Sequence, residues 1–386
     1  DALPISHPKG LYVLFATEMW ERYNYYGMRA ILVLFMTKAL LFDKVFASNL
    51  YGSYTSLIYL TPLIGGYIAD RYWGNRRSII VGGIVMAIGE FILFFCGSLY
   101  ATSPDTASLL FFSGLGFMIA GNGFFKPNIS TLLGNFYSKE EYLDKKDEGY
   151  NIFYMGINVG AFICNFFGAA LQILLGWKFA FMAAGVGMFI GVIVFLIGTK
   201  HYVGFDQKKG VQEGDMPFYK IVLFILLPSV IFGVIGWLIK GVASPINTDS
   251  YIFGSDSTNA FIFACIPVVF FYGSLYFKAK QEDKRPIGAL LTIFAVVILF
   301  WAVFKLNGSA LTTWADRYTD RQITGSTETV FNTLKLSKEV EYKKDSVELY
   351  DANFKLQKTN GVIQKEFNYP LYFRNVAKDE LPAEGS

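Results

Sequence analysis

Long apolar stretches, separated by short polar ones, dominate the chain up to residue 316. About 20 apolar residues in a row form a helix that crosses the hydrocarbon core of a bilayer. The pattern predicts about nine such helices, at residues 10–41, 47–69, 78–99, 107–136, 150–175, 178–199, 218–240, 259–278 and 286–315. Residues 317–386 contain no such run, and we expect either a small fold or a solvated connector there. The predicted fold class is an all-α membrane protein.

The Lys and Arg residues between these helices are unevenly distributed. They gather in alternate loops, at residues 71–77, 139–146, 200–209 and 278–285, whereas the loops between these carry one or none. Lys and Arg close to membrane-spanning helices mark the cytoplasmic side. We therefore expect a multi-pass protein of the inner (plasma) membrane of the cell, with a cytoplasmic amino terminus and residues 317–386 outside.

Composition narrows the function class further. Hydrophobic residues make up 53% of the 386-residue chain and charged ones 17%, which is unlike a soluble domain. A net charge of +3 is too small to indicate a nucleic-acid partner, so lipid is the expected surrounding. The three cysteines lie in apolar runs, so we expect free thiols at Cys96, Cys164 and Cys265. The only histidines are His7 and His201, and no catalytic or metal-spaced cluster is present, so we expect no enzyme, no metal and no bound cofactor.

The first predicted helix carries a stripe of polar residues inside an apolar segment. Three- and four-residue spacing puts them on one face: Glu18, Glu21, Arg22, Tyr25, Tyr26 and Arg29. Each charge at the centre of a bilayer costs about 2.5–3.5 kcal/mol, so this face must contact protein or water. A lone Glu–Arg pair is often a buried ion pair that fixes helix packing. Four charges with two tyrosines favour a polar translocation pathway.

Two further segments contain charges next to glycines. Residues 65–77 join the second and third helices, where glycines permit close helix approach and Asp70 can pair with an arginine such as Arg71 or cap a helix. Residues 121–132 place Lys126 inside an apolar helix, where a carboxylate is the expected partner, with Glu18 or Glu21 as candidates. The following Pro127 frees a backbone carbonyl one turn earlier and opens the helix locally.

Two more segments supply polar side chains in the apolar helices. In residues 153–161, Asn158 offers a donor and an acceptor that suit a peptide bond, although a lone Asn is more often an interhelical contact. In residues 300–316, helical spacing predicts one polar face. That face contains Trp301, Lys305, Gly308, Ser309, Thr312 and Asp316.

Several of these motifs together resemble one family. The sequence Glu-x-x-Glu-Arg-Tyr-x-Tyr-Tyr-Gly at residues 18–27 is similar to the first-helix motif of the proton-coupled oligopeptide transporters, usually written ExxERFxYY, with Tyr23 in place of Phe. Residues 121–132 match the Gly-x-x-Lys-Pro-Asn core of the same family, and residues 153–161 resemble its Phe-Tyr-x-x-Ile-Asn-x-Gly signature. Residues 65–77 resemble the inner-loop signature of the major facilitator superfamily, to which that family belongs.

The resemblance implies a domain organisation. Residues 1–200 are expected to form the N-terminal six-helix bundle, 201–285 an inserted transmembrane helix pair with flanking loops, and 286–316 the first helix of the second bundle. Residues 317–386 are then a polar extracytoplasmic segment. The second bundle is incomplete in this chain, so the missing helices are expected from the intact chain or from a partner.

The resemblance also implies a function and a set of roles. It indicates a symporter that imports di- and tripeptides with protons as the coupling ion, by alternating access. The peptide carboxylate is expected at Arg22 and Lys126, while Glu18 and Glu21 exchange protons with Lys126 as their partner. The pocket is expected to be lined by Tyr25, Tyr26, Tyr59, Asn158 and Trp301. Gating or structural roles fall to Asp70, Arg71, Arg29 and Lys305.

One position departs from the family pattern. Lys305 stands where most members carry a Glu that pairs with the residue equivalent to Arg29. Two cations a few ångströms apart repel by roughly 4 kcal/mol at an effective dielectric of 20, so they should not both lie there uncompensated. Lys305 could lose its proton, an acid could lie between the two, or the outer gate could be held differently, and we favour the intervening acid. Asp316 is one candidate, and the absent helices are another source.

Two other functions remain open from the sequence. A transporter of the same fold could carry another small carboxylate or nitrate, although both glutamates and both tyrosines of the first-helix motif argue against it. The odd number of predicted spans instead suits a membrane-embedded binding or assembly module, a half-transporter that presents its polar tail to an outer partner.

Overall fold

The computed structural model describes residues 6–206, 217–243 and 256–318 and, beyond them, 323, 325–334, 336–337, 343, 345–348, 357–359 and 362–368. The chain forms two compact units. The first comprises Asp1–Ala47, Tyr54–Gly210 and Ala310–Ser386, and the second comprises Ser48–Ser53 and Val211–Ser309.

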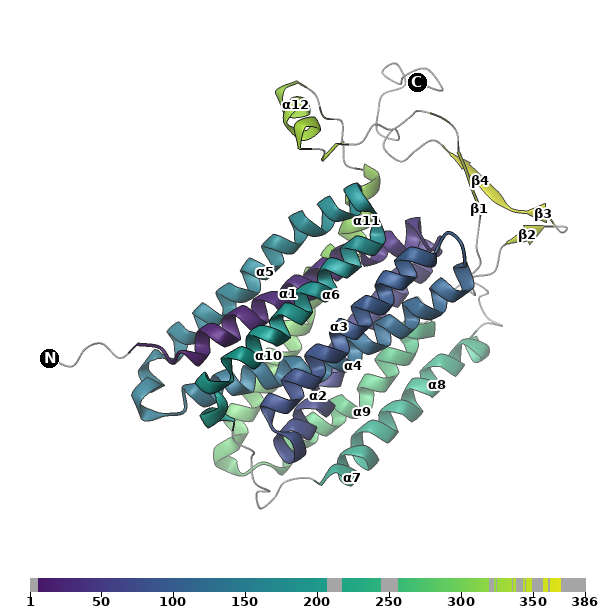
Figure 1. The fold of residues 1–386 in the computed structure, drawn as a ribbon. Coiled ribbons are helices and arrows are strands. Elements are labelled where there is room, and N and C mark those ends of the chain that lie inside the picture. Colours follow the sequence, from purple (N-terminus) through teal and green to yellow (C-terminus); the bar gives the residue numbers. More distant parts are fainter. Residues whose placement is uncertain are drawn as a thin grey trace. The chain divides into compact units, whose positions relative to one another are not determined.

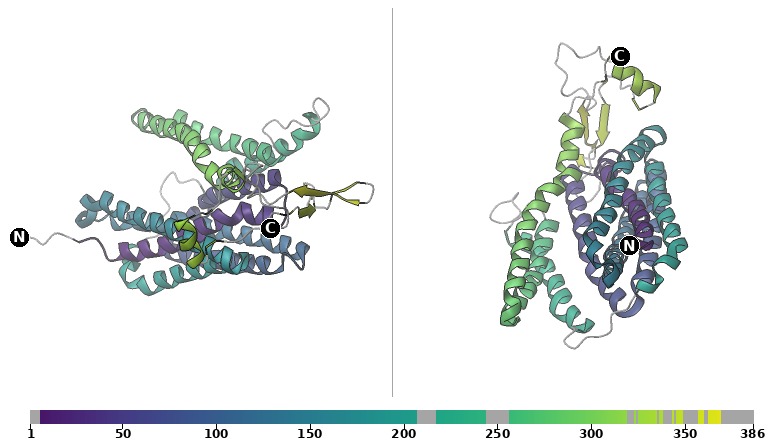
Figure 2. Two further views of the ribbon diagram at one scale, coloured as in Figure 1. Left: turned by 90° about the horizontal axis from the view of Figure 1, so that it is seen from above. Right: turned by 90° about the vertical axis from the view of Figure 1, so that its left-hand side faces the viewer.

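The first unit is built around a helical bundle (Figure 1). Its long helices are α1 (Gly10–Lys38), α2 (Lys44–Ile68), α3 (Asn75–Leu99), α4 (Pro104–Phe136), α5 (Lys146–Leu175) and α6 (Trp177–Ile197). A π-helical turn, Ala69–Trp73, follows α2, and a short 3-10 helix, Glu140–Lys145, precedes α5. Helix α1 packs against α5 and α6, while α3 packs against α4 and α6, and the helices run side by side in both views of Figure 2.

Glycines bring α2 and α4 into backbone contact. Pro127 has no N–H, so the carbonyl of Gly123 one turn earlier lacks its helical donor. A Cβ on Gly65 of α2 would lie 2.0 Å from that carbonyl oxygen. The amide of Asn128 donates to the Phe124 carbonyl at 2.6 Å and to the Gly65 carbonyl at 3.5 Å. Helix α4 continues through Pro127, and the Gly123 carbonyl that lacks its helical donor lies where α2 approaches α4 closely.

We expect Gly65→Ala to destabilise the protein, because the added methyl group collides with backbone that cannot yield without moving a helix. Overpacking of this kind typically costs about 1–3 kcal/mol. Gly116→Ala on α4 is the matched control, since an added Cβ there meets nothing within 4 Å. Thermal unfolding in detergent should show a lower Tm for Gly65→Ala alone, and an unchanged Tm would contradict the observed contact.

The second unit contains the helices that follow the bundle in sequence. They are α7 (Phe218–Ile221), a π-helical turn (Val222–Leu226), α8 (Leu227–Ala243), α9 (Asp256–Lys278) and α10 (Gln281–Phe304). Helices α8 and α9 pack against each other, with Gly236 close to the carbonyl of Asn259.

The ninth predicted helix differs from the prediction. Helix α10 ends at Phe304, a 3-10 turn covers Lys305–Gly308, and a separate helix, α11 (Ala310–Tyr318), begins afterwards. The prediction that residues 301–316 form one continuous polar face is therefore wrong. Asn307, Gly308 and Ser309 are poor helix formers, and together they interrupt the helical spacing on which that prediction rested. The side chain of Asp316 lies outside the described residues.

Short elements follow α11 in the described part of residues 317–386. Helix α12 (Ser326–Thr333) precedes two antiparallel strand pairs. Strand β1 (Asp345–Glu348) pairs with β4 (Lys365–Asn368), and β2 (Lys358–Thr359) pairs with β3 (Val362–Ile363). The inner pair is thus enclosed in sequence by the outer one.

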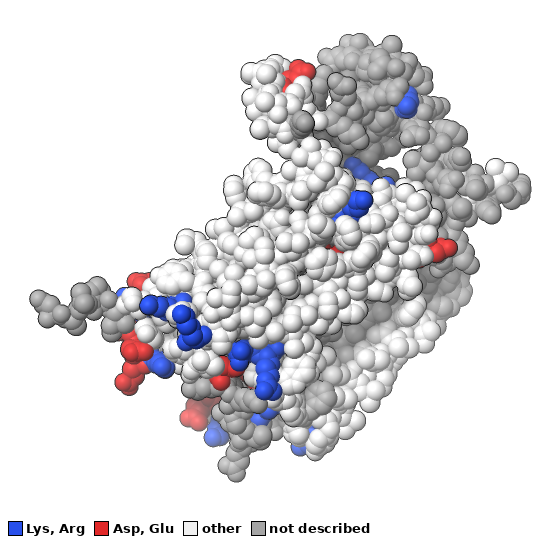
Figure 3. All heavy atoms as spheres, in the orientation of Figure 1, with Lys and Arg blue, Asp and Glu red and all other residues white. Residues whose placement is uncertain are grey.

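The helices have the length and composition of membrane spans. Among the described residues, seven helical stretches are long and apolar enough to cross a bilayer. They are Asn75–Leu99, Pro104–Phe136, Glu140–Leu175, Trp177–His201, Tyr219–Ile239, Thr258–Lys278 and Gln281–Thr312. Helices α1 and α2 are also long, but polar residues interrupt them. On the face drawn in Figure 3 the charged side chains lie toward the ends of the bundle, with a broad uncharged surface between them.

Candidate functional site

The polar stripe of α1 forms a buried ion cluster. Glu18, Glu21 and Arg22 are 3%, 0% and 2% exposed. The Nε atom of Arg22 donates to Glu18 Oε1 at 2.8 Å and lies 2.5 Å from Glu21 Oε2. Glu18 reaches Arg22 because residues four apart are neighbours on one helix face. One guanidinium therefore serves both carboxylates.

The cluster retains polar atoms without partners. Arg22 Nη2 and Glu18 Oε2 are buried and make no hydrogen bond. Buried donors and acceptors are almost always satisfied in proteins, so an unused guanidinium donor next to carboxylates is unusual. Such an atom can donate to an anion that enters the site.

Two tyrosines cover the guanidinium. The Arg22 Cζ atom lies 5.2 Å from the ring centroid of Tyr25 and 6.0 Å from that of Tyr26. The two rings meet edge to face with centroids 5.2 Å apart. Tyr25 is buried and Tyr26 half-buried. Cation–π contact of this kind holds the guanidinium plane in place.

Helix α4 completes the cluster in a way that differs from the prediction. Asn122 Nδ2 donates to Glu21 Oε1 at 3.2 Å. Lys126, one turn further along α4, makes no ion pair with either glutamate within the described residues, and its ammonium lies 4.8 Å from the ring centroid of Tyr59 on α2. The expected Lys126–glutamate pair is therefore replaced by Arg22–glutamate pairs, because Arg22 lies on the same helix as both acids.

Asn122 is the site residue that sequence reasoning missed. It lies four positions before Lys126 and so on the same face of α4, which is the signal that would have found it. Its amide is the link between α4 and the acids of α1. The Oδ1 atom of Asn122 is itself buried without a partner.

Asn158 lies apart from the cluster. Its side chain is exposed and its amide donates to the Tyr154 carbonyl of its own helix at 3.2 Å. Helix α5 meets the cluster instead at Gly160, where an added Cβ would lie 2.2 Å from the Met19 carbonyl oxygen and 3.1 Å from Arg22 Cβ. In the described residues the Asn158 side chain makes no hydrogen bond to another helix.

The helix that follows the loop after α2 is capped by a residue that was not predicted. Asp70 and Arg71 lie in the π-helical turn before Gly74, whose φ of +79° suits glycine. The first turn of α3 is capped by Asp206, whose Oδ1 accepts from the backbone N–H groups of Asn75 at 2.9 Å and Arg76 at 3.3 Å. Asp206, which follows α6, therefore caps the start of α3.

The remaining predicted residues are Arg29, Lys305 and Trp301. Arg29 is buried in the C-terminal half of α1. The Lys305 ammonium lies 5.3 Å from the ring of Trp301. Arg29 belongs to the first unit and the other two to the second, so the juxtaposition of Arg29 with Lys305 stays a prediction.

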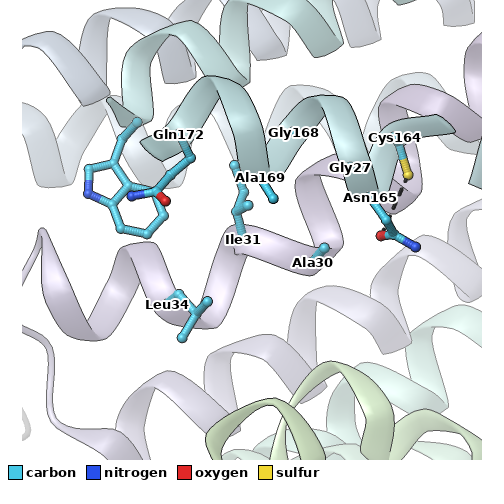
Figure 4. A pocket seen from close by; sticks show the side chains of 10 residues that line it. Gly27, Ala30, Ile31, Leu34, Cys164, Asn165, Gly168, Ala169 and Gln172 are labelled. Atoms are coloured by element: carbon cyan, nitrogen blue, oxygen red, sulfur yellow. Dashed lines mark hydrogen bonds between the residues drawn. The ribbon is translucent and has the colours of Figure 1, made fainter. Parts of the chain in front are cut away.

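A small cavity of about 140 Å³ lies between α1 and α5 (Figure 4). Its wall begins at Gly27, next to Tyr26, and carries small residues with Asn165 and Gln172 as polar groups. Glu18, Glu21, Arg22 and Lys126 do not line it. Typical ligand sites measure roughly 300–1,000 Å³, so this cavity is too small to be a whole substrate site.

Comparison with known proteins identifies the family. The POT family profile matches residues 76–334. The uncharacterized transporter YclF of Bacillus subtilis (strain 168) is 32% identical over 322 residues, covering 81% of this chain and 61% of that protein. A di-/tripeptide transporter of Lactococcus lactis subsp. lactis (strain IL1403) is 31% identical over 319 residues, with the same coverages. The chain thus spans about three-fifths of the length of these relatives.

Solved structures agree with this result. A peptide transporter POT in complex with sulfate superposes with a TM-score of 0.64 at 28% identity, covering 83% of this chain and 63% of that one. A POT family transporter in complex with a thioalcohol-conjugated peptide superposes with a TM-score of 0.66 at 26% identity, covering 83% of this chain and 64% of that one. The predicted fold class, a helical membrane protein of the major facilitator type, is confirmed. The chain belongs to the POT family.

Proposed function

We propose that this chain is part of a proton-coupled symporter that imports di- and tripeptides by alternating access, with protons as the coupling ion and no other cofactor. The observation that carries the proposal is the buried Arg22, which has an unused Nη2 donor, together with Lys126, which forms no ion pair among the described residues. These two cations suit the carboxylate of a peptide. The relatives named di-/tripeptide transporters support the same cargo.

Charge balance links the cargo to a proton. Glu18, Glu21, Arg22 and Lys126 together carry two negative and two positive charges, so the empty cluster is neutral. A peptide carboxylate adds one negative charge at a place where an uncompensated charge is costly. One proton taken up by Glu18 or Glu21 restores neutrality. Because Arg22 holds both acids, protonation of either one releases part of the guanidinium for the peptide.

Uptake of a labelled dipeptide by cells that express the intact reading frame tests this function. We expect uptake of the labelled dipeptide to stop when the proton gradient is collapsed. Unlabelled dipeptides should compete with it, whereas nitrate and simple carboxylates should not. Uptake of nitrate or of a simple carboxylate without dipeptide uptake would favour the other cargo. Absence of any uptake would favour the binding or assembly module.

The proposed orientation places the amino terminus in the cytoplasm and residues 317–386 outside, in the inner (plasma) membrane. Single cysteines at Ser138 and Ser326 report on the two sides, and both positions are exposed. In a variant without the native cysteines, an impermeant maleimide added to intact cells should label Ser326→Cys and spare Ser138→Cys. The reverse pattern would contradict the orientation.

A further inference from the structure

Another buried carboxyl lies in the bundle outside the ion cluster. Glu90 of α3 has no exposed surface. Its Cβ lies 3.1 Å from the position that a Cβ on Gly185 of α6 would take. Its Oε1 accepts a hydrogen bond from Asn24 Nδ2 of α1 at 3.1 Å. Glu90 therefore lies where α1, α3 and α6 meet, and none of the sequence signatures contains it.

The hydrogen bonds between Asn24 and Glu90 leave one oxygen atom of each side chain without a partner. The amide of Asn24 has two N–H groups, and Nδ2 donates to Glu90 Oε1 and to the Ala184 carbonyl at 3.2 Å. The carbonyl can only accept, which fixes the orientation of the amide. Asn24 Oδ1 and Glu90 Oε2 are buried and have no partner. If Glu90 is ionised, both of these oxygen atoms can only accept hydrogen bonds, so neither can donate to the other.

No cation forms an ion pair with Glu90 in the part of the chain that the structure describes. Within residues 6–206, no Lys, Arg or His makes an ion pair with it. On the packed helices, Arg22 of α1 is bonded to Glu18 and Glu21, Lys178 of α6 lies over the ring of Phe179, and Arg29 is a further charged residue of α1. On α4, Lys126 lies over Tyr59. A carboxylate held by one amide N–H in an apolar bundle is strongly disfavoured.

We propose that Glu90 is a proton-binding site of its own, held as a neutral carboxylic acid whose O–H donates to Asn24 Oδ1. The proton supplies the missing donor, removes the buried charge and turns the contact into an acid–amide pair. At 100° per residue, Asn24 lies about half a turn around α1 from Arg22. Asn24 and Glu90 are thus positioning residues that hold α1 from the side away from the ion cluster. This inference is independent of the cargo.

Infrared difference spectroscopy and thermal unfolding of the purified chain test the proposal. The carbonyl stretch of a protonated carboxyl lies apart from the carboxylate bands. At neutral pH, subtracting the Glu90→Gln spectrum from that of the unmutated protein should leave one such band. Glutamine carries both a donor and an acceptor and can replace the acid in the pair, so Glu90→Gln should keep its Tm. Glu90→Ala should lower the Tm by several degrees, because it strands the Asn24 amide.

Glu141→Gln is the matched control, since Glu141 is exposed and should contribute no neutral-carboxyl band. A band difference for Glu90 alone, with a retained Tm in Glu90→Gln, supports the proposal. An unchanged neutral-carboxyl region in Glu90→Gln, or a Tm as low as that of Glu90→Ala, overturns it. Neither readout involves uptake, so failure here leaves the proposed transport function untouched.

Discussion

Arg22→Ala is expected to abolish peptide uptake and to lower the free energy of unfolding by about 3–5 kcal/mol, the usual cost of removing one partner from a buried ion pair. Glu18 and Glu21 are almost fully buried and share this one guanidinium. Without it, two like charges would face each other in an apolar bundle, and the hydrogen bond from Asn122 to Glu21 cannot offset both.

Thermal unfolding of three variants separates charge from shape. Arg22→Lys keeps the positive charge but loses the planar fork and its cation–π contacts with Tyr25 and Tyr26, so an intermediate Tm is expected. Adding Glu18→Gln and Glu21→Gln to Arg22→Ala removes the stranded charges and should restore the Tm while uptake stays absent. An Arg22→Ala protein as stable as the unmutated one would show that the ion cluster is not what the structure describes.

Lys126→Ala is expected to lose much of its peptide affinity with little change in Tm, whereas Arg22→Ala should lose both uptake and stability. Lys126 makes no ion pair in the described residues, and one proton on Glu18 or Glu21 balances the net negative charge that its removal leaves. A charge-assisted hydrogen bond to the peptide carboxylate is worth about 1.5–3 kcal/mol, which corresponds to a loss of affinity of roughly 10- to 150-fold.

Isothermal titration with a dipeptide and a melting curve measure the two properties on one preparation. Lys146→Ala, at the exposed start of α5, is the control for loss of one positive charge. It should bind the dipeptide normally. A Lys126→Ala protein that unfolds as readily as Arg22→Ala, or that binds the dipeptide normally, would contradict the assignment of Lys126 to the substrate.

Much of the fold was predictable because it depends on local properties. Helix positions follow from the length of the apolar runs, and each predicted span corresponds to a helix in the described residues. The exception is the stretch after Phe304, where a 3-10 turn replaces the predicted helix and Asn307, Gly308 and Ser309 disfavour helical backbone. Apolar length alone does not register such a break, because it measures burial in lipid and not backbone preference.

The sequence predicts which site residues share a face of one helix, but it predicts contacts between residues of different helices less well. The stripe of α1 follows from the helical period, and Glu18, Glu21 and Arg22 do form one cluster. The partner of Lys126, the direction of Asn158 and the cap by Asp206 depend on how each helix is rotated against its neighbour. Single-sequence spacing carries no information about that rotation.

The most direct test of the central claim compares one dipeptide as its free acid and as its C-terminal amide. The account holds that Arg22 and Lys126 bind the peptide carboxylate, so the amide should bind at least about tenfold more weakly to the unmutated protein. Lys126→Ala should narrow that difference, because one of the two cations that distinguish acid from amide is gone. Equal affinity of the unmutated protein for the acid and the amide would contradict the account.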